Sequence, residues 1–333
     1  MTELLAARLE YDDALDLVED YHRRGWTDGL PIVPPTPDAV ERFLDAAGVD
    51  GSEVLGTVPT REVVVTAEHA AINAVMAGCR PEYMPVVVAA VRAHLREKAN
   101  CHSTTGTLSG ASQLVVINGP VRTELDVACT AGCFGPGFRA NATIGRALRL
   151  VIRNVCRSIP GFLDRATFST PARYSFCFGE DEEGSPWLPL HVERGLPAGS
   201  SAVTVHSVMV MLASTDFVSR TPEGVLDSLA RTIRRQGTAG DRWLGEGTNV
   251  VAVMGPEHRR YLVEAGWSKA DARAYLWPKL MAPQQPGEGR VKLGSPEGLL
   301  LVAAGGPGMA ETWVMFPHLA WAITEPVVRG GPT

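Results

Sequence analysis

The chain has 333 residues, of which 45% are hydrophobic and 20% are charged. These values are ordinary for a globular protein and leave room for one large domain or two smaller ones. The formal net charge of −6 argues against non-specific binding to nucleic acid, so we expect no nucleic-acid partner. No apolar run is long enough for a membrane span or a signal peptide, so we expect no membrane association. Six cysteines at irregular spacing do not suggest disulfides, and we expect reduced thiols and a cytoplasmic location.

Residues 1–50 are predicted to form an arm that packs against the main body. Apolar residues at helical spacing predict one helix over residues 11–23 and another over residues 37–47. Between these helices, residues 28–36 contain three prolines within five positions, which favours an extended strap. The apolar residues of the strap indicate that it packs rather than hangs free.

The rest of the sequence predicts an α/β fold with two related halves, because one order of elements occurs twice. The order is a strand, a Glu-His pair, a helix that ends in Ala-Gly, a second helix and a second strand. In the first half (51–170) these pieces are 63–65, Glu68-His69, a helix ending at Gly78, a helix over 81–96 and the strand 114–118. In the second half (246–333) they are 249–253, Glu257-His258, a helix ending at Gly266, a helix from Ser268 and the strand 299–303.

Residues 171–245 are predicted to connect the two halves through two strands and a helix that Thr221 caps. A duplicated α/β unit creates a cleft between its copies. Ligands of open α/β sheets bind beyond the carboxyl ends of strands. We therefore expect a ligand site between the halves.

The segment 129–143 is a glycine-rich loop that leads into a helix. Free backbone N–H groups and the helix dipole at such a place attract anions, so a carboxylate or phosphate cradle is one interpretation. A tight, capped turn with a solvated arginine is the other. The sequence contains no P-loop and no dinucleotide-binding motif, and the cofactor stays undetermined. The residues expected to bind the anion are Gly135, Gly137, Arg139, Asn141 and Arg146.

Two cysteines of this loop are candidate nucleophiles. Cys133 and, less directly, Cys129 precede a helix and an arginine, and such surroundings can lower the pKa of a thiol. A redox pair and ordinary core packing are the alternatives.

Several further polar residues are candidates for acid–base chemistry or binding. His69 and His258 hold matching places in the two halves and would face one cleft as general bases, or they simply begin helices. A short loop after residue 185 suggests proton transfer by His191 and Glu193 and anion binding by Arg194. No metal-binding motif is present, so no metal ligands are predicted.

Across most of its length the chain resembles the bacterial UGSC-like family, which is named for a selenocysteine or cysteine motif. The resemblance implies an enzyme-like cytosolic protein. The family's motif suggests redox or nucleophilic chemistry, which carries over to this chain only if Cys129 or Cys133 replaces that motif. The Gly-Ser-Cys motif itself is absent, and its counterpart is the turn 305–309, where Gly306 and Gly308 are expected to bind substrate. The resemblance rests on 28–36, 77–83, 118–120, 135–149, 185–195 and 255–269.

The leading hypothesis is a cytosolic enzyme that uses Cys133 on a small metabolite with a carboxylate or phosphate. One alternative is a lyase or hydratase that works through His and Glu residues, with or without a metal. A second alternative is a metabolite-binding subunit whose partner carries the reactive group. A homo-oligomer or a small partner subunit also fits the sequence.

Overall fold

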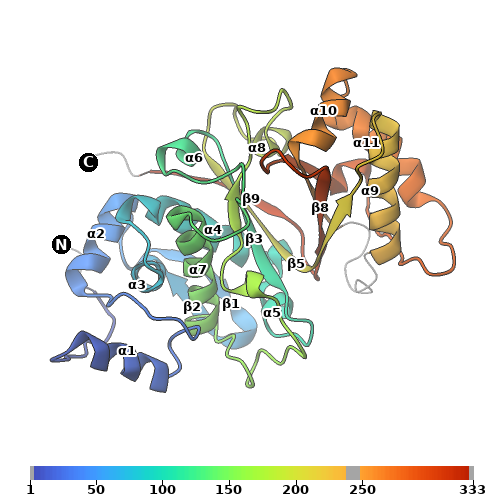
Figure 1. Cartoon of the computed structure of the whole chain (residues 1–333). Coiled ribbons are helices and arrows are strands. Elements are labelled where there is room, and N and C mark those ends of the chain that lie inside the picture. The colour runs from blue at the N-terminus through green and yellow to red at the C-terminus, as the bar shows by residue number, and fades with distance from the viewer. Residues whose placement is uncertain (1–3, 238–247, 330–333) are drawn as a thin grey trace.

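The fold is built on one curled sheet of seven strands (Figure 1). The computed structural model describes residues 4–237 and 248–329. The strand order is β4-β3-β5-β8-β6-β7, and β9 pairs with β5. The curl brings the two edge strands together, since the N–H of Asp181, just after β4, donates to the carbonyl of Ala303 in β7 at 2.7 Å. The strands are β3 (Ser112–Asn118), β4 (Cys177–Gly179), β5 (Ala202–Thr215), β6 (Val250–Met254), β7 (Leu299–Ala303), β8 (Glu311–Pro317) and β9 (Ile323–Pro326).

The sheet consists of two similar three-stranded parts. In one, β3 and β4 are parallel and β5 runs antiparallel to β3; in the other, β6 and β7 are parallel and β8 runs antiparallel to β6. A Gly-Pro step follows β3 and begins α6 (Pro120–Glu124), and another follows β6 and begins α10 (Pro256–Glu264). A long helix then precedes the second parallel strand: α7 (Arg139–Asn154) before β4, and α11 (Lys269–Met281) before β7.

The α/β class and the strand–helix–helix–strand pattern are confirmed, but the first half consists of other segments than those predicted. β2 (Val63–Thr66) pairs with β1 (Val54–Val58) in a separate two-stranded sheet. The counterpart of β6 is therefore β3, and His69 and His258 do not hold equivalent positions. The reason is that a Glu-His pair is a local helix-start signal, whereas strand pairing depends on contacts distant in sequence.

Three apolar cores fill the part of the fold that the structure describes. The inner core lies within the curl and draws side chains from all six strands of the main order, such as Val116, Val208 and Val302. One outer core packs α2 (Pro37–Ala47), α3 (Ala67–Ala77), α4 (Met84–Leu95) and α7. The other packs α9 (Pro222–Gln236), α10 and α11. Helices therefore cover the outer face of each half (Figure 1).

The N-terminal arm packs on the first half, as its composition predicts. After α1 (Ala14–Arg23) the chain runs extended, and Val33 N–H donates to the carbonyl of Met76. The predicted boundaries at residues 51, 171 and 246 stay predictions. Residues 1–3, 238–247 and 330–333, which belong to three of these segments, lie outside the described residues.

Among the described residues, two further α-helices are short. α5 (Cys101–Thr105) precedes β3, and α8 (Leu190–Glu193) lies between β4 and β5. Within residues 4–237 and 248–329, no helix combines the length and apolar character that a membrane crossing needs.

Substitution of Gly119 tests the turn that follows β3. Its φ is +81°, and an added Cβ would lie 2.1 Å from the carbonyl oxygen of Ser200. Gly199 has nearly the same φ, +80°, but open space around the added atom. We expect Gly119→Ala to destabilise by about 3 kcal/mol or more and Gly199→Ala by about 1 kcal/mol in urea unfolding. Equal losses would show that the close approach to Ser200 carries no cost.

Candidate functional site

Two glycine-rich segments that the sequence singles out meet in one pocket. The loop 130–135 and the turn 305–309 enclose about 370 Å³ at the carboxyl ends of β6 and β7. We call this cavity the glycine pocket. Four predicted site residues line it: Cys133, Gly135, Gly306 and Gly308.

Close backbone contacts hold the walls of the glycine pocket together. Gly305 N–H donates to the carbonyl of Cys129 at 2.9 Å. A Cβ on Gly306 would lie 2.5 Å from the Cβ of Ala131, so this position accepts only glycine. Asn141 stabilises the loop from the first turn of α7, because its Nδ2 donates to the carbonyl of Cys133 at 3.2 Å. Asn141 therefore shapes the loop and is not among the residues that line the pocket.

The glycine pocket does not have the charge that the sequence suggests. Among the described residues that line it, Glu311 alone is charged. Phe134 and Trp313 supply an aromatic wall, with ring centroids 6.2 Å apart. Gly137 lies in the same loop but outside this lining. The pocket therefore offers a thiol, an aromatic wall and one carboxylate rather than cations.

The expected lowering of the thiol pKa values is wrong. Cys133 is 4% exposed and packs in the inner core, and burial raises its pKa to about 11. Burial also raises the pKa of Cys129, although Arg122 Nη1 lies 3.5 Å from its sulfur. Both groups are protonated thiols at neutral pH. A hydrogen bond from Cys156 lowers the pKa of Cys101, which lies buried elsewhere.

The three predicted histidines do not line the glycine pocket. His69 completes the cap of α3 with Thr66. His258 lies 2.9 Å from the hydroxyl of Thr312 and 3.2 Å from a backbone carbonyl. The ring nitrogens of His191 are buried without a hydrogen-bond partner in the part of the chain that the structure describes. Burial lowers the pKa of all three, so they are neutral bases without a shared site.

The predicted anion-binding arginines fasten chain segments instead. Arg139 donates to the carbonyls of residues 78 and 79, and Arg194 donates to the hydroxyl of Thr324 and a nearby carbonyl. Arg146 forms a two-point ion pair with Asp28 at 2.8 Å. The position of an arginine in or near a loop does not reveal which partner its long side chain reaches.

Glu193 is likewise engaged in structural ion pairs. Its carboxylate accepts from Arg273 at 2.9 Å and lies 3.1 Å from Lys269. Lys269 is buried and also contacts Glu180 at 3.1 Å. This network joins the loop after β4 to α11, so it locks the two halves together rather than presenting a free carboxylate.

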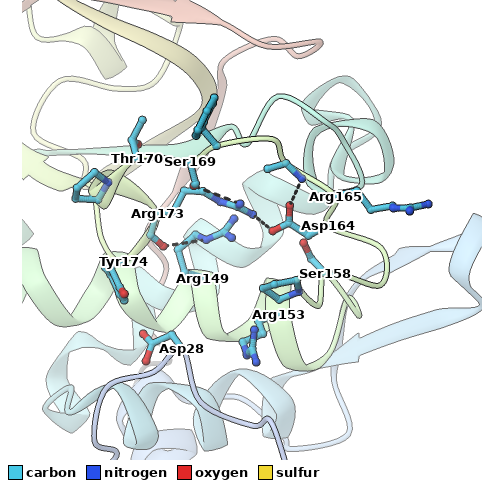
Figure 2. A pocket seen from close by; sticks show the side chains of 15 residues that line it. Asp28, Arg149, Arg153, Ser158, Asp164, Arg165, Ser169, Thr170, Arg173 and Tyr174 are labelled. Atoms are coloured by element: carbon cyan, nitrogen blue, oxygen red, sulfur yellow. Dashed lines mark hydrogen bonds and ion pairs between the residues drawn. The ribbon is translucent and has the colours of Figure 1, made fainter.

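A larger pocket lies along the second half of α7, where the sequence predicts no site. It encloses about 710 Å³ between α7 and the loop 158–174 (Figure 2). We call it the arginine pocket. Its charged lining residues are Arg149, Arg153, Arg165, Arg173, Asp28 and Asp164.

The two aspartates of the arginine pocket already have partners. Asp164 pairs with Arg173, and Asp28 pairs with Arg146, which does not line the pocket. Four arginines and two aspartates leave a formal lining charge of +2. Among the described residues, no carboxylate forms an ion pair with Arg149, Arg153 or Arg165.

Arg149 is the most unusual of these cations. It is only 8% exposed, and its guanidinium donates to Gln113 Oε1 and to the carbonyl of Arg173. Burial, aided by the charge of Arg173, lowers its pKa to about 9. Asp164 opposes this lowering, but it pairs directly with Arg173. A buried charge without a direct partner of opposite charge costs several kcal/mol. An anion in the pocket would offset this cost.

The sequence does contain a signal for the arginine pocket. Arg146, Arg149 and Arg153 lie three and four residues apart, so they share one face of α7. Arg149 also stands between Leu148 and Leu150, both fully buried. An arginine inside such an apolar stretch is expected only where a partner or ligand meets it.

Comparisons with known proteins add no assignment. No protein family, no curated protein and no solved structure matches the chain. The resemblance to the UGSC-like family therefore stays a hypothesis. Within the residues that the structure describes, no three or more His, Cys, Asp or Glu side chains are grouped so as to hold a metal ion.

The pKa of Cys133 makes a direct prediction about thiol reactivity. At pH 7 a thiol with a pKa of about 11 has roughly 300-fold less thiolate than a free cysteine with a pKa of about 8.5. The alkylation rate at Cys133 should therefore rise about tenfold per pH unit from pH 7 to 10, whereas that of free cysteine levels off. Iodoacetamide labelling with peptide mass analysis measures both. A rate at pH 7 above that of free cysteine would contradict this.

Proposed function

We propose that the protein binds a small organic anion, a carboxylate or a phosphate, in the arginine pocket. The observation that carries this proposal is Arg149, a buried cation that forms no ion pair with a carboxylate of the described residues. The size of the pocket, about 710 Å³, lies within the range of small-molecule sites.

The chemistry of the lining favours binding of an oxyanion. Guanidinium groups offer paired N–H donors that match the two oxygens of a carboxylate or phosphate. The buried Nε atoms of Arg153 and Arg173 have no hydrogen-bond partner among the described residues. Ser158, Ser169 and Thr170 also line the pocket, and Arg173 Nη1 donates to the Ser169 hydroxyl at 3.4 Å (Figure 2).

No histidine or cysteine occurs among the described residues that line the arginine pocket. Binding therefore has more support here than bond making, which favours the alternative of a metabolite-binding protein. We place this function in the cytoplasm, because all six cysteines are free thiols and such thiols suit a reducing compartment. A homo-oligomer or a small partner subunit stays a prediction.

Catalysis in the glycine pocket is the second candidate. Its support is that segments from both halves converge on Cys133 at the carboxyl ends of parallel strands. Because its thiol is protonated at neutral pH, Cys133 would need a base before it attacked an electrophile. The lyase or hydratase alternative lacks a shared site, since His191, Glu193 and His258 do not line this pocket.

Thermal shifts in the presence of anions test the proposed function. A ligand at ten times its Kd stabilises the folded protein by about 1.4 kcal/mol, so acetate, phenylacetate, inorganic phosphate or phenyl phosphate should raise the Tm. Arg149→Met and Arg153→Met should lose most of this increase. Arg139→Gln is the matched control, because Arg139 lies outside the pocket and should leave the increase intact.

Two outcomes would overturn the proposal. One is that none of the four anions raises the Tm of the unaltered protein. The other is that Arg139→Gln abolishes the increase as fully as the two pocket substitutions do, which would indicate a general charge effect. Comparing Arg149→Met with Arg153→Met keeps the test valid if one of them folds poorly.

A further inference from the structure

The arginine pocket has aromatic side chains beside its cations. Phe168 and Tyr174 both line it, and they are 83% and 48% exposed. Tyr174 lies on the side of Arg149 that faces away from Asp164 (Figure 2). Pro160 and Pro171 add further apolar surface to the lining. Cationic and apolar surfaces therefore adjoin within one cavity.

Although the Phe168 side chain is exposed, hydrogen bonds hold the backbone around it. The chain is held on both sides of Phe168. Thr167 N–H donates to the carbonyl of Leu108, which precedes β3, at 2.9 Å, and the Thr170 hydroxyl lies 3.0 Å from that of Ser112, the first residue of β3. The backbone on either side of Phe168 is therefore fixed at the pocket wall. An aromatic side chain has only two rotatable bonds to order when it covers a ligand.

The arginine pocket is larger than a small anion alone would fill. An inorganic anion or acetate would meet the guanidinium groups but would leave most of about 710 Å³ empty and Phe168 in water. The formal lining charge of +2, from four arginines and two aspartates, suits a ligand with one or two negative charges. The rest of such a ligand must then cover the aromatic surface.

We infer that the ligand is an amphipathic organic anion in which an aromatic group is joined to a carboxylate or a phosphate. This inference rests on the proposed function of the arginine pocket and adds the class of ligand. Arg149 binds the charged group, and Phe168 covers the aromatic one. Phe168 is thus a specificity-determining residue, while the arginines supply the attraction that all anions share.

Titration calorimetry with two matched pairs of ligands tests this inference. The pairs are phenylacetate with acetate and phenyl phosphate with inorganic phosphate. The aromatic member of at least one pair should bind about tenfold or more tightly than its small counterpart. The pair with the larger preference identifies the charged group as carboxylate or phosphate.

Substitutions separate the aromatic contribution from the charge. Phe168→Ala should remove most of the aromatic preference and leave the affinity for the small anion unchanged within about twofold. Phe162→Ala is the control, because Phe162 is 76% exposed in the same loop but is not among the residues that line the pocket. It should keep the full preference. Arg149→Met should weaken both members of a pair.

The outcomes distinguish failure of the inference from failure of the proposed function. If aromatic and small anions bind equally well and Arg149→Met weakens both, the inference is overturned and anion binding stands. Equal effects of Phe168→Ala and Phe162→Ala also overturn the inference. If neither kind of anion binds, both are overturned.

Discussion

The antiparallel pairing of β5 with β8 is the constraint on which the rest of the structure depends. It joins the two three-stranded parts of the sheet through residue pairs that run from Val208 with Pro317 to Thr215 with Glu311. Because the paired parts curl toward each other, the ends of β4 and β7 meet, and the buried ion pairs of Lys269 lock the junction. The glycine pocket exists because this curl brings a loop of the first half over the strand ends of the second.

Helix α7 links the two candidate sites. The loop before its first residue supplies Cys133 to the glycine pocket, and its second half supplies Arg149 and Arg153 to the arginine pocket. Sixteen residues span roughly 24 Å, so a small molecule cannot occupy both sites. The buried charge of Arg149 is a feature that folding alone does not favour, and such local departures mark functional sites.

The order of elements in the second half could be predicted from the sequence, because β6, α10, α11 and β7 follow one another along the chain. The first half was predicted from the wrong segments, because β2, α3, α4 and β3 also follow one another in the order strand, helix, helix, strand. For the sites, the glycine segments 130–135 and 305–309 were recognisable because positive φ and close approach require glycine. The roles of Arg139, Arg146 and Arg194 were not, because a long side chain reaches partners distant in sequence.

The sequence by itself determined the α/β class, the packed N-terminal strap and the two glycine-rich turns, because these follow from local periodicity, proline content and backbone conformation. Only the tertiary structure decided which strands correspond and which arginines form no ion pair with a carboxylate of the described residues. It did so because ion pairs such as Asp28 with Arg146 and Asp164 with Arg173 depend on spatial neighbours. Because both aspartates of the arginine pocket pair with other arginines, neither forms an ion pair with Arg149.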